Sequence, residues 1–157
     1  MTDPGILRNV AAPELHRALR GHRFEDPERR GKWLIARTDG PALLLHFGMT
    51  GGVQWAPAAT GRHRHDRVIL VLDIGEIRYR NMRKLGGVWL ASEPADVDEL
   101  LGRLGPDALS VRRKDFLELM GSRRGRVKAA LLDQSFLAGV GNLLADETLW
   151  RARIHPA

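Results

Sequence analysis

Residues 131–147, with the sequence LLDQSFLAGVGNLLADE, decide the fold of the second half of the chain. The stretch predicts a helix, a tight glycine turn and a second helix, with the carboxamide of Asn142 at the turn. Gly139 and Gly141 can take positive φ and let the backbone approach a ligand closely. The N-terminus of the following helix offers unpaired N–H groups and a favourable dipole to an anion. We therefore expect a phosphate site at this turn, with Asn142 donating to the same anion.

Composition favours a globular protein with an anionic partner. The 157 residues are 43% hydrophobic, which is enough for one domain or two small subdomains around a packed core. Lysine and arginine total 25 against 19 acidic residues, a net charge of +6, so nucleic acid is the first candidate partner. The chain has no cysteine, which excludes disulfides and thiolate metal sites within these residues. No apolar run is long enough to span a membrane and the first residues do not resemble a signal peptide, so we expect a cytoplasmic protein with no membrane contact.

The hydrophobic pattern changes part-way along the chain. After a short helix at 13–20, β-branched and apolar runs predict antiparallel strands at 32–37, 42–47, 68–72, 77–81 and 87–91. Residues 48–67, rich in Gly, Pro, Ala and His, are expected to form a loop. From Ser92 onward the period is helical, with helices around 97–104, 116–120, 127–131 and 143–154. The predicted domains are residues 1–91 and 92–157.

Seven basic residues lie between Arg112 and Lys128, against only Asp115 and Glu118. The glycine turn that follows should therefore sit in a positive field. Such a cluster neutralises phosphates and predicts strong salt dependence without sequence preference. A solvated helical face is the alternative interpretation, and it is the commoner one for a charge run taken alone.

Five motifs in this order resemble the formamidopyrimidine-DNA glycosylase and endonuclease VIII family of base-excision repair enzymes. They are RRGKWL at 29–34, HFGMTG at 46–51, HD at 65–66, RKLG at 83–86, and the stretch from LLDQ at 131–134 to HP at 155–156. The resemblance implies an α+β fold, with an incomplete antiparallel β-sandwich followed by a helix-two-turn-helix domain. It also implies duplex DNA with oxidised bases or abasic sites as the partner.

By this resemblance, six residues would grip DNA while a damaged nucleotide is flipped out of the stack. Lys32, His65 and Asn142 would contact phosphates. Met49, Arg83 and Leu85 would fill the vacated space, Met49 because an unbranched apolar side chain fits an irregular gap. Leu85 stands where the family usually has an aromatic residue.

Each of these residues also has a plainer interpretation. Met49 could be ordinary core or turn packing, Lys32 a solvated lysine, and Asn142 a helix cap. Glu147 is expected to accept hydrogen bonds from turn amides. His63 and His65 lack a third ligand, so no metal site is expected.

The resemblance implies a nucleophile that this chain does not match. In the family it is the secondary amine of an N-terminal proline, followed by a glutamate general acid. Pro4 is internal, so its nitrogen is a tertiary amide, and Glu14 does not match the glutamate. The family's zinc finger is not encoded either, so no cofactor is expected.

Three interpretations follow. The first is a truncated form of a bifunctional glycosylase and abasic-site lyase, inactive as written. A related possibility is a structural fragment that folds poorly alone, because missing first strands would leave an unpaired sheet edge. The second is a genuine short protein that binds damaged DNA without catalysis. The third is an RNA- or ribosome-binding helix-two-turn-helix protein, against which the strand-rich half argues.

Overall fold

The computed structural model describes residues 3–58 and 60–156, which form two compact units. The first, called the β unit here, comprises Met1–Glu28 and Trp33–Leu100; the second, the helical unit, comprises Arg29–Lys32 and Leu101–Ala157. The domain boundary expected after residue 91 stays a prediction.

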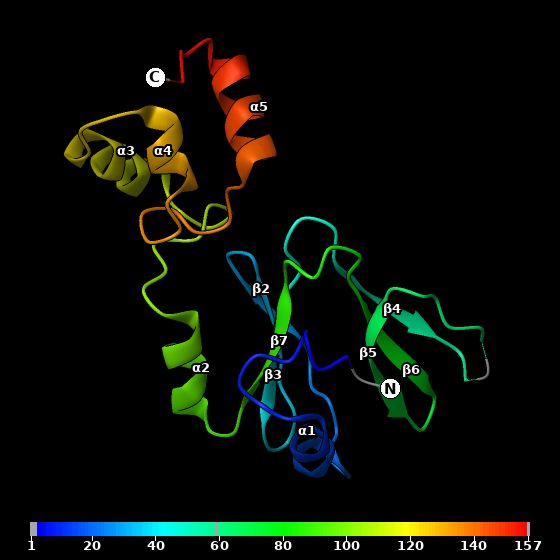
Figure 1. Cartoon of the computed structure of the whole chain (residues 1–157). Helices are drawn as coiled ribbons and strands as arrows, with labels where there is room; N and C mark the ends of the chain where they lie inside the picture. Colours follow the sequence, from blue (N-terminus) through cyan, green and yellow to red (C-terminus); the bar gives the residue numbers. More distant parts are fainter. Residues whose placement is uncertain (1–2, 59, 157) are drawn as a thin grey trace. The chain divides into compact units, whose positions relative to one another are not determined.

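Two antiparallel sheets lie in the β unit, apart from Arg29 and Arg30 of the short first strand, which belong to the helical unit (Figure 1). One has the order β1-β2-β3-β7 and the other the order β4-β6-β5. The strands are β1 (Glu28–Arg30), β2 (Trp33–Ala36), β3 (Ala42–His46), β4 (Gly52–Ala56), β5 (Asp66–Leu72), β6 (Gly75–Arg80) and β7 (Gly87–Ala91). The unit also holds the helix α1 (Ala12–Leu19) and all of α2 (Pro94–Leu101) but its last residue.

The core of the β unit follows from the strand pattern. Strand β3 lies between β2 and β7, and four of its five residues are buried, as expected of a central strand. Leu43 and Leu45 point to the same face and join a cluster with Val68 and Tyr79 of the other sheet. The two sheets therefore share one apolar core.

Strand β4 corrects the expected loop at 48–67. Gly52–Ala56 pairs with β6 in antiparallel register, with Trp55 opposite Ile77. The strand is short, begins at a glycine pair and is followed by Pro57, so turn-forming residues hide it in the sequence. The short strand β1 was not predicted either.

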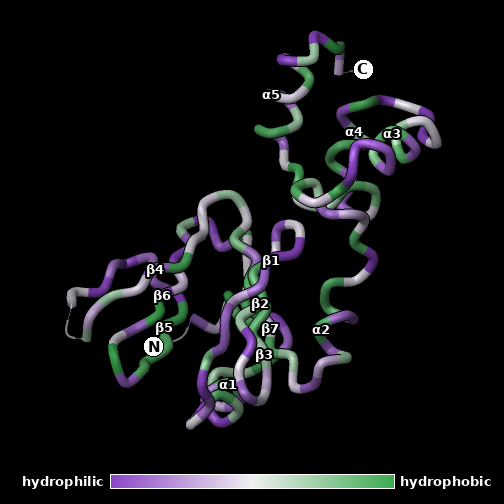
Figure 2. The backbone as a smooth tube through the Cα atoms, turned by 180° about the vertical axis from the view of Figure 1, so that it is seen from behind, coloured by the Kyte–Doolittle hydropathy of each residue, from purple (hydrophilic) through white to green (hydrophobic). Residues whose placement is uncertain are grey.

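The helical unit contains α3 (Arg113–Ser122), α4 (Val127–Leu132) and α5 (Asn142–Ala152) (Figure 1). Its core consists of Ala130, Leu131, Phe136, Leu137, Ala145 and Leu149. The arginine-rich loop at 123–126, between α3 and α4, lies in the hydrophilic colours of Figure 2. The predicted α+β class is confirmed, and no helix in the described residues is long and apolar enough to cross a membrane.

Candidate nucleic-acid interface

The glycine turn between α4 and α5 is closed by a side chain that sequence reasoning did not single out. The Gln134 carboxamide donates to the Leu132 carbonyl at 2.9 Å and to the Val140 carbonyl at 3.0 Å, and accepts from the Gly139 N–H at 3.0 Å. Gly139 has a φ of 106°, which favours glycine. A polar residue just after a helix and a few residues before a glycine pair is the signal that could have indicated this role. Gln134 therefore fixes the path of the chain into α5.

Asn142 does not cap α5, so the interpretation as a helix cap is wrong. Asn142 is the first residue of the helix; Gly141 occupies the cap position and no side chain caps the helix. The Asn142 side chain is exposed and has no hydrogen-bond partner among residues 3–58 and 60–156. Both its amide and the first N–H groups of an eleven-residue helix are available to a ligand.

Lys32 lies at the start of this helix. A Cβ added at Gly141 would stand 3.7 Å from Lys32 Nζ. Lys32 is half-buried and forms no ion pair with a described residue, and burial lowers the pKa of its ammonium group. We call Lys32, Gly141 and Asn142 the phosphate corner. An ammonium group and a positive helix end, both without an anionic partner, favour binding of an anion there.

Asp107 binds the backbone next to Lys32. Its carboxylate accepts hydrogen bonds from Arg29 NH2 at 2.6 Å, from the Gly31 N–H at 2.7 Å and from the Leu109 N–H at 2.9 Å. The Arg29 guanidinium is the main reason that the pKa of Asp107 falls to about 2. Gly31 has a φ of 59°, and a Cβ there would come 3.2 Å from Ala138 Cβ. The carboxylate and the close packing together fix the backbone just before Lys32.

In the β unit, two loops carry the predicted void-filling residues. We call the turn at 47–51 and the loop at 82–86 the wedge loops. Met49 is 74% exposed and Leu85 is 57% exposed, so the interpretation of Met49 as core packing is wrong. The loops lie side by side, because a Cβ added at Gly48 would stand 2.8 Å from the Leu85 carbonyl carbon. The structure thus brings together Met49 and Leu85, and it places the exposed Arg83 in the same loop as Leu85.

Met82 is a further exposed residue of the wedge loops that sequence reasoning missed. It is 50% exposed and immediately precedes Arg83. A methionine before an arginine carries no periodic signal, so only the structure identifies it. Three exposed apolar side chains on two loops in contact make this the candidate surface for entering the duplex.

His65 lies among cations. Arg64 Nε approaches its Nε2 at 3.2 Å, and Arg67 NH2 approaches its Nδ1 at 3.2 Å. Burial and the neighbouring arginines lower the pKa of His65, which favours the neutral ring. The rings of His63 and His65 are 5.2 Å apart, and no group of three metal-binding side chains occurs in the described part of the chain.

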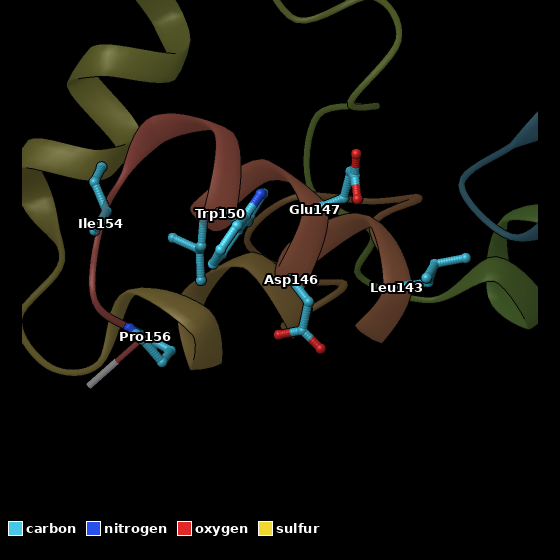
Figure 3. A pocket seen from close by; sticks show the side chains of 7 residues that line it. Leu143, Asp146, Glu147, Trp150, Ile154 and Pro156 are labelled. Atoms are coloured by element: carbon cyan, nitrogen blue, oxygen red, sulfur yellow. The ribbon is translucent and has the colours of Figure 1, made fainter.

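An apolar groove runs along α5 (Figure 3). Its lining includes Leu143, Trp150 and Ile154, with carboxylates at Asp146 and Glu147. Glu147 pairs with Arg151 at 2.8 Å and not with turn amides, so its predicted role is wrong. Because of its apolar walls and two carboxylates, this groove is not suited to phosphate.

The predicted site residues therefore fall into two sets. Lys32 lies against Gly141, the residue before Asn142, in the helical unit, while Met49, His65, Arg83 and Leu85 belong to the β unit. Their DNA-contacting roles stay predictions.

Comparison with known proteins assigns both halves of the chain. Residues 1–88 match the formamidopyrimidine-DNA glycosylase N-terminal domain, and residues 104–157 match the formamidopyrimidine-DNA glycosylase H2TH domain. This confirms the predicted helix-two-turn-helix domain.

Curated relatives and solved structures agree with this family match. A formamidopyrimidine-DNA glycosylase of Geobacter sulfurreducens is 39% identical over 154 residues, which are 96% of this chain and 56% of the relative. One of Acidothermus cellulolyticus is 42% identical over 144 residues, covering 88% and 51% of the two chains. The Lactococcus lactis Fpg in complex with DNA containing an abasic site has a TM-score of 0.87 and 31% identity, covering 99% of this chain and 58% of that one. The same enzyme with FAPY-dG-containing DNA also gives a TM-score of 0.87.

The chain spans a little more than half the length of these relatives. The family match extends over more than half of its own residues and includes both domains in order. This chain belongs to the formamidopyrimidine-DNA glycosylase family.

Proposed function

We propose that this protein binds duplex DNA at a damaged or abasic nucleotide, as part of base-excision repair by a DNA glycosylase. The phosphate corner is the observation that carries this proposal: Lys32 has no carboxylate partner among the described residues and lies at the start of α5. A phosphate there would gain a charge-assisted hydrogen bond from Lys32 and donors from Asn142 and the helix end.

The wedge loops explain why damaged DNA would be preferred. Flipping a nucleotide leaves a gap in the stack, and exposed apolar side chains on a rigid base can fill it. The solved Lactococcus lactis complexes contain an abasic site or FAPY-dG, which supports the same class of ligand for this chain. Such a protein would act as a monomer in the cytoplasm, on the nucleoid, without a metal or other cofactor.

Removal of the base and cleavage of the strand are proposed for the glycosylase to which this pair of domains belongs. Pro4 cannot supply the nucleophile, because its nitrogen is part of a peptide bond. We therefore expect residues 1–157 to bind an abasic site without forming a Schiff base. Borohydride trapping on abasic DNA tests this: no adduct is expected, and an adduct would mean that a lysine acts as the nucleophile.

Competition binding tests the proposal as a whole. A labelled duplex with a tetrahydrofuran abasic analogue is displaced by unlabelled abasic duplex, intact duplex of the same sequence, or structured RNA. Abasic duplex should compete best, and EDTA should leave its affinity unchanged. Better competition by RNA would contradict the proposal and favour the RNA-binding alternative.

A further inference from the structure

Asn81 is a completely buried polar residue that follows directly after β6. Its side chain has an exposure of 0%. A loop asparagine is usually exposed, so its burial needs a reason. Its neighbours are the two wedge loops and the segment that carries His65.

The contacts of Asn81 join three pieces of chain. Its Nδ2 donates to the Phe47 carbonyl at 3.1 Å and to the Tyr79 hydroxyl at 3.0 Å. Its backbone N–H donates to the His65 carbonyl at 3.0 Å. A Cβ added at Gly86 would stand 2.8 Å from the same Nδ2. The turn that presents Met49 therefore packs on the residue from which the other wedge loop begins.

We propose that Asn81 is a positioning residue that makes the two wedge loops act as one rigid body. This inference rests on the proposed function for its DNA readout. The joint, by which we mean the hydrogen bonds of Asn81 that connect the two wedge loops, is a property of the fold itself. Through Nδ2, Asn81 fixes the carbonyl of Phe47, and through its backbone it fixes the start of the loop that carries Arg83 and Leu85. Met49 and Leu85 would then enter the gap together.

The Asn81 carboxamide acts through its donor Nδ2 and not through its acceptor Oδ1. Asn81 Oδ1 has no hydrogen-bond partner among residues 3–58 and 60–156. The contribution of the side chain therefore comes from Nδ2, because the loss of a buried donor that two oxygens share costs free energy.

The fold should survive removal of this side chain. Tyr79 still donates to the His46 carbonyl at 2.8 Å, and Arg67 Nε still donates to the Asn81 carbonyl at 3.0 Å. Asn81→Ala should thus loosen the joint while the β unit stays folded.

Amide hydrogen exchange tests the joint without DNA. In Asn81→Ala, the Gly51 N–H, which donates to the Phe47 carbonyl at 2.9 Å, should exchange at least about tenfold faster than in the wild type. Amides of β7 should keep their exchange rates. Asn9→Ala is the matched control, since Asn9 also bonds to backbone, at 2.8 Å from the Leu90 carbonyl, but its bonds go to β7. Unchanged exchange at Gly51 would overturn the proposal.

A double-mutant cycle tests the consequence for DNA. Met49→Ala and Leu85→Ala are combined in the wild type and in Asn81→Ala, and affinity for the abasic duplex is measured. In the wild type, the affinity loss of the double variant should differ from the product of the two single losses by about fivefold or more. In Asn81→Ala it should equal that product. Equal coupling in both backgrounds would overturn the proposal. If the wild type does not prefer abasic DNA, the proposed function fails while the exchange result still decides on Asn81.

Discussion

The phosphate corner of the helical unit and the wedge loops of the β unit are supported in different ways. At the corner, an ion pair between Asp107 and Arg29 holds the backbone next to a cation. At the wedge loops, neutral hydrogen bonds and close glycine packing hold apolar side chains at the surface. Changes of salt concentration and pH should therefore alter the phosphate corner, and changes of side-chain volume should alter the wedge loops.

Gly86→Ala should have the largest effect, because the wedge loops leave no room at their base. A Cβ at Gly86 would overlap the His46 carbonyl oxygen and the Tyr79 hydroxyl. Because the first of these atoms is backbone, the free energy of unfolding of the β unit should fall by at least about 3 kcal/mol. Denaturant unfolding followed by amide signals of β3 and β7 measures the loss.

Gly121→Ala is the matched change in the helical unit. Gly121 lies in α3 and nothing stands within 4 Å of an added Cβ. Alanine there should be neutral or stabilise by up to about 1 kcal/mol. Equal destabilisation by both variants would contradict the contrast between the two regions.

Asp107→Asn should weaken the phosphate corner in a pH-dependent way. The pKa of Asp107 is about 2 in the folded state, against an ordinary value of 3.8 for an aspartate. A lowered folded pKa means that its stabilisation is complete above pH 3.8 and is lost as the pH falls toward 2. At pH 7 the free energy of unfolding of the variant should be about 2 kcal/mol below that of the wild type. This difference should disappear near pH 2.

Asp115→Asn is the control for this change. Asp115 of α3 pairs at 2.7 Å with Arg112, the residue before the helix, and this arginine is 80% exposed. Such a surface pair contributes less than about 1 kcal/mol. Unfolding curves of both variants between pH 2 and 7 decide the point, and a gap for Asp107→Asn that does not change with pH would count against the ion pair.

The sequence predicted those features whose residues lie close together along the chain. The apolar runs of β3 and β7 and the glycine turn before α5 are contiguous patterns, so they were found. Strand β4 was hidden by its flanking Gly and Pro residues. Arg29 and Asp107 are 78 residues apart, so no spacing could reveal their pairing. Asn81 stands at the end of the strand predicted at 77–81, and only tertiary packing shows that its side chain is buried.

Lys32→Met and Met49→Ala should separate the two regions in binding to abasic duplex. Each should reduce affinity by about tenfold, since each removes one contact to DNA. Lys32→Met keeps most of the apolar stem but loses the charge, so the slope of log affinity against log salt should fall by about one. Met49→Ala should leave that slope unchanged. Fluorescence anisotropy titrations at several salt concentrations give both quantities, and equal slopes for the two variants would mean that Lys32 does not contact phosphate.

His65 provides the smallest expected effect and brings a pH response into the β unit. Burial, Arg64 and Arg67, with His63 and Arg80 nearby, lower its pKa, so its stabilisation of the fold is present above pH 6.5 and is lost as the pH falls through its folded pKa. A phosphate placed against the ring would offset these cations and raise the pKa, so binding should take up a proton. Affinity for abasic duplex should then rise by about twofold to threefold from pH 7.5 to pH 6. This rise should vanish in His65→Ala and persist in His22→Ala, whose histidine pairs with Asp39 at 2.8 Å. Titration calorimetry in buffers of different ionisation enthalpy measures the proton uptake directly, and uptake that survives in His65→Ala would place it on another group.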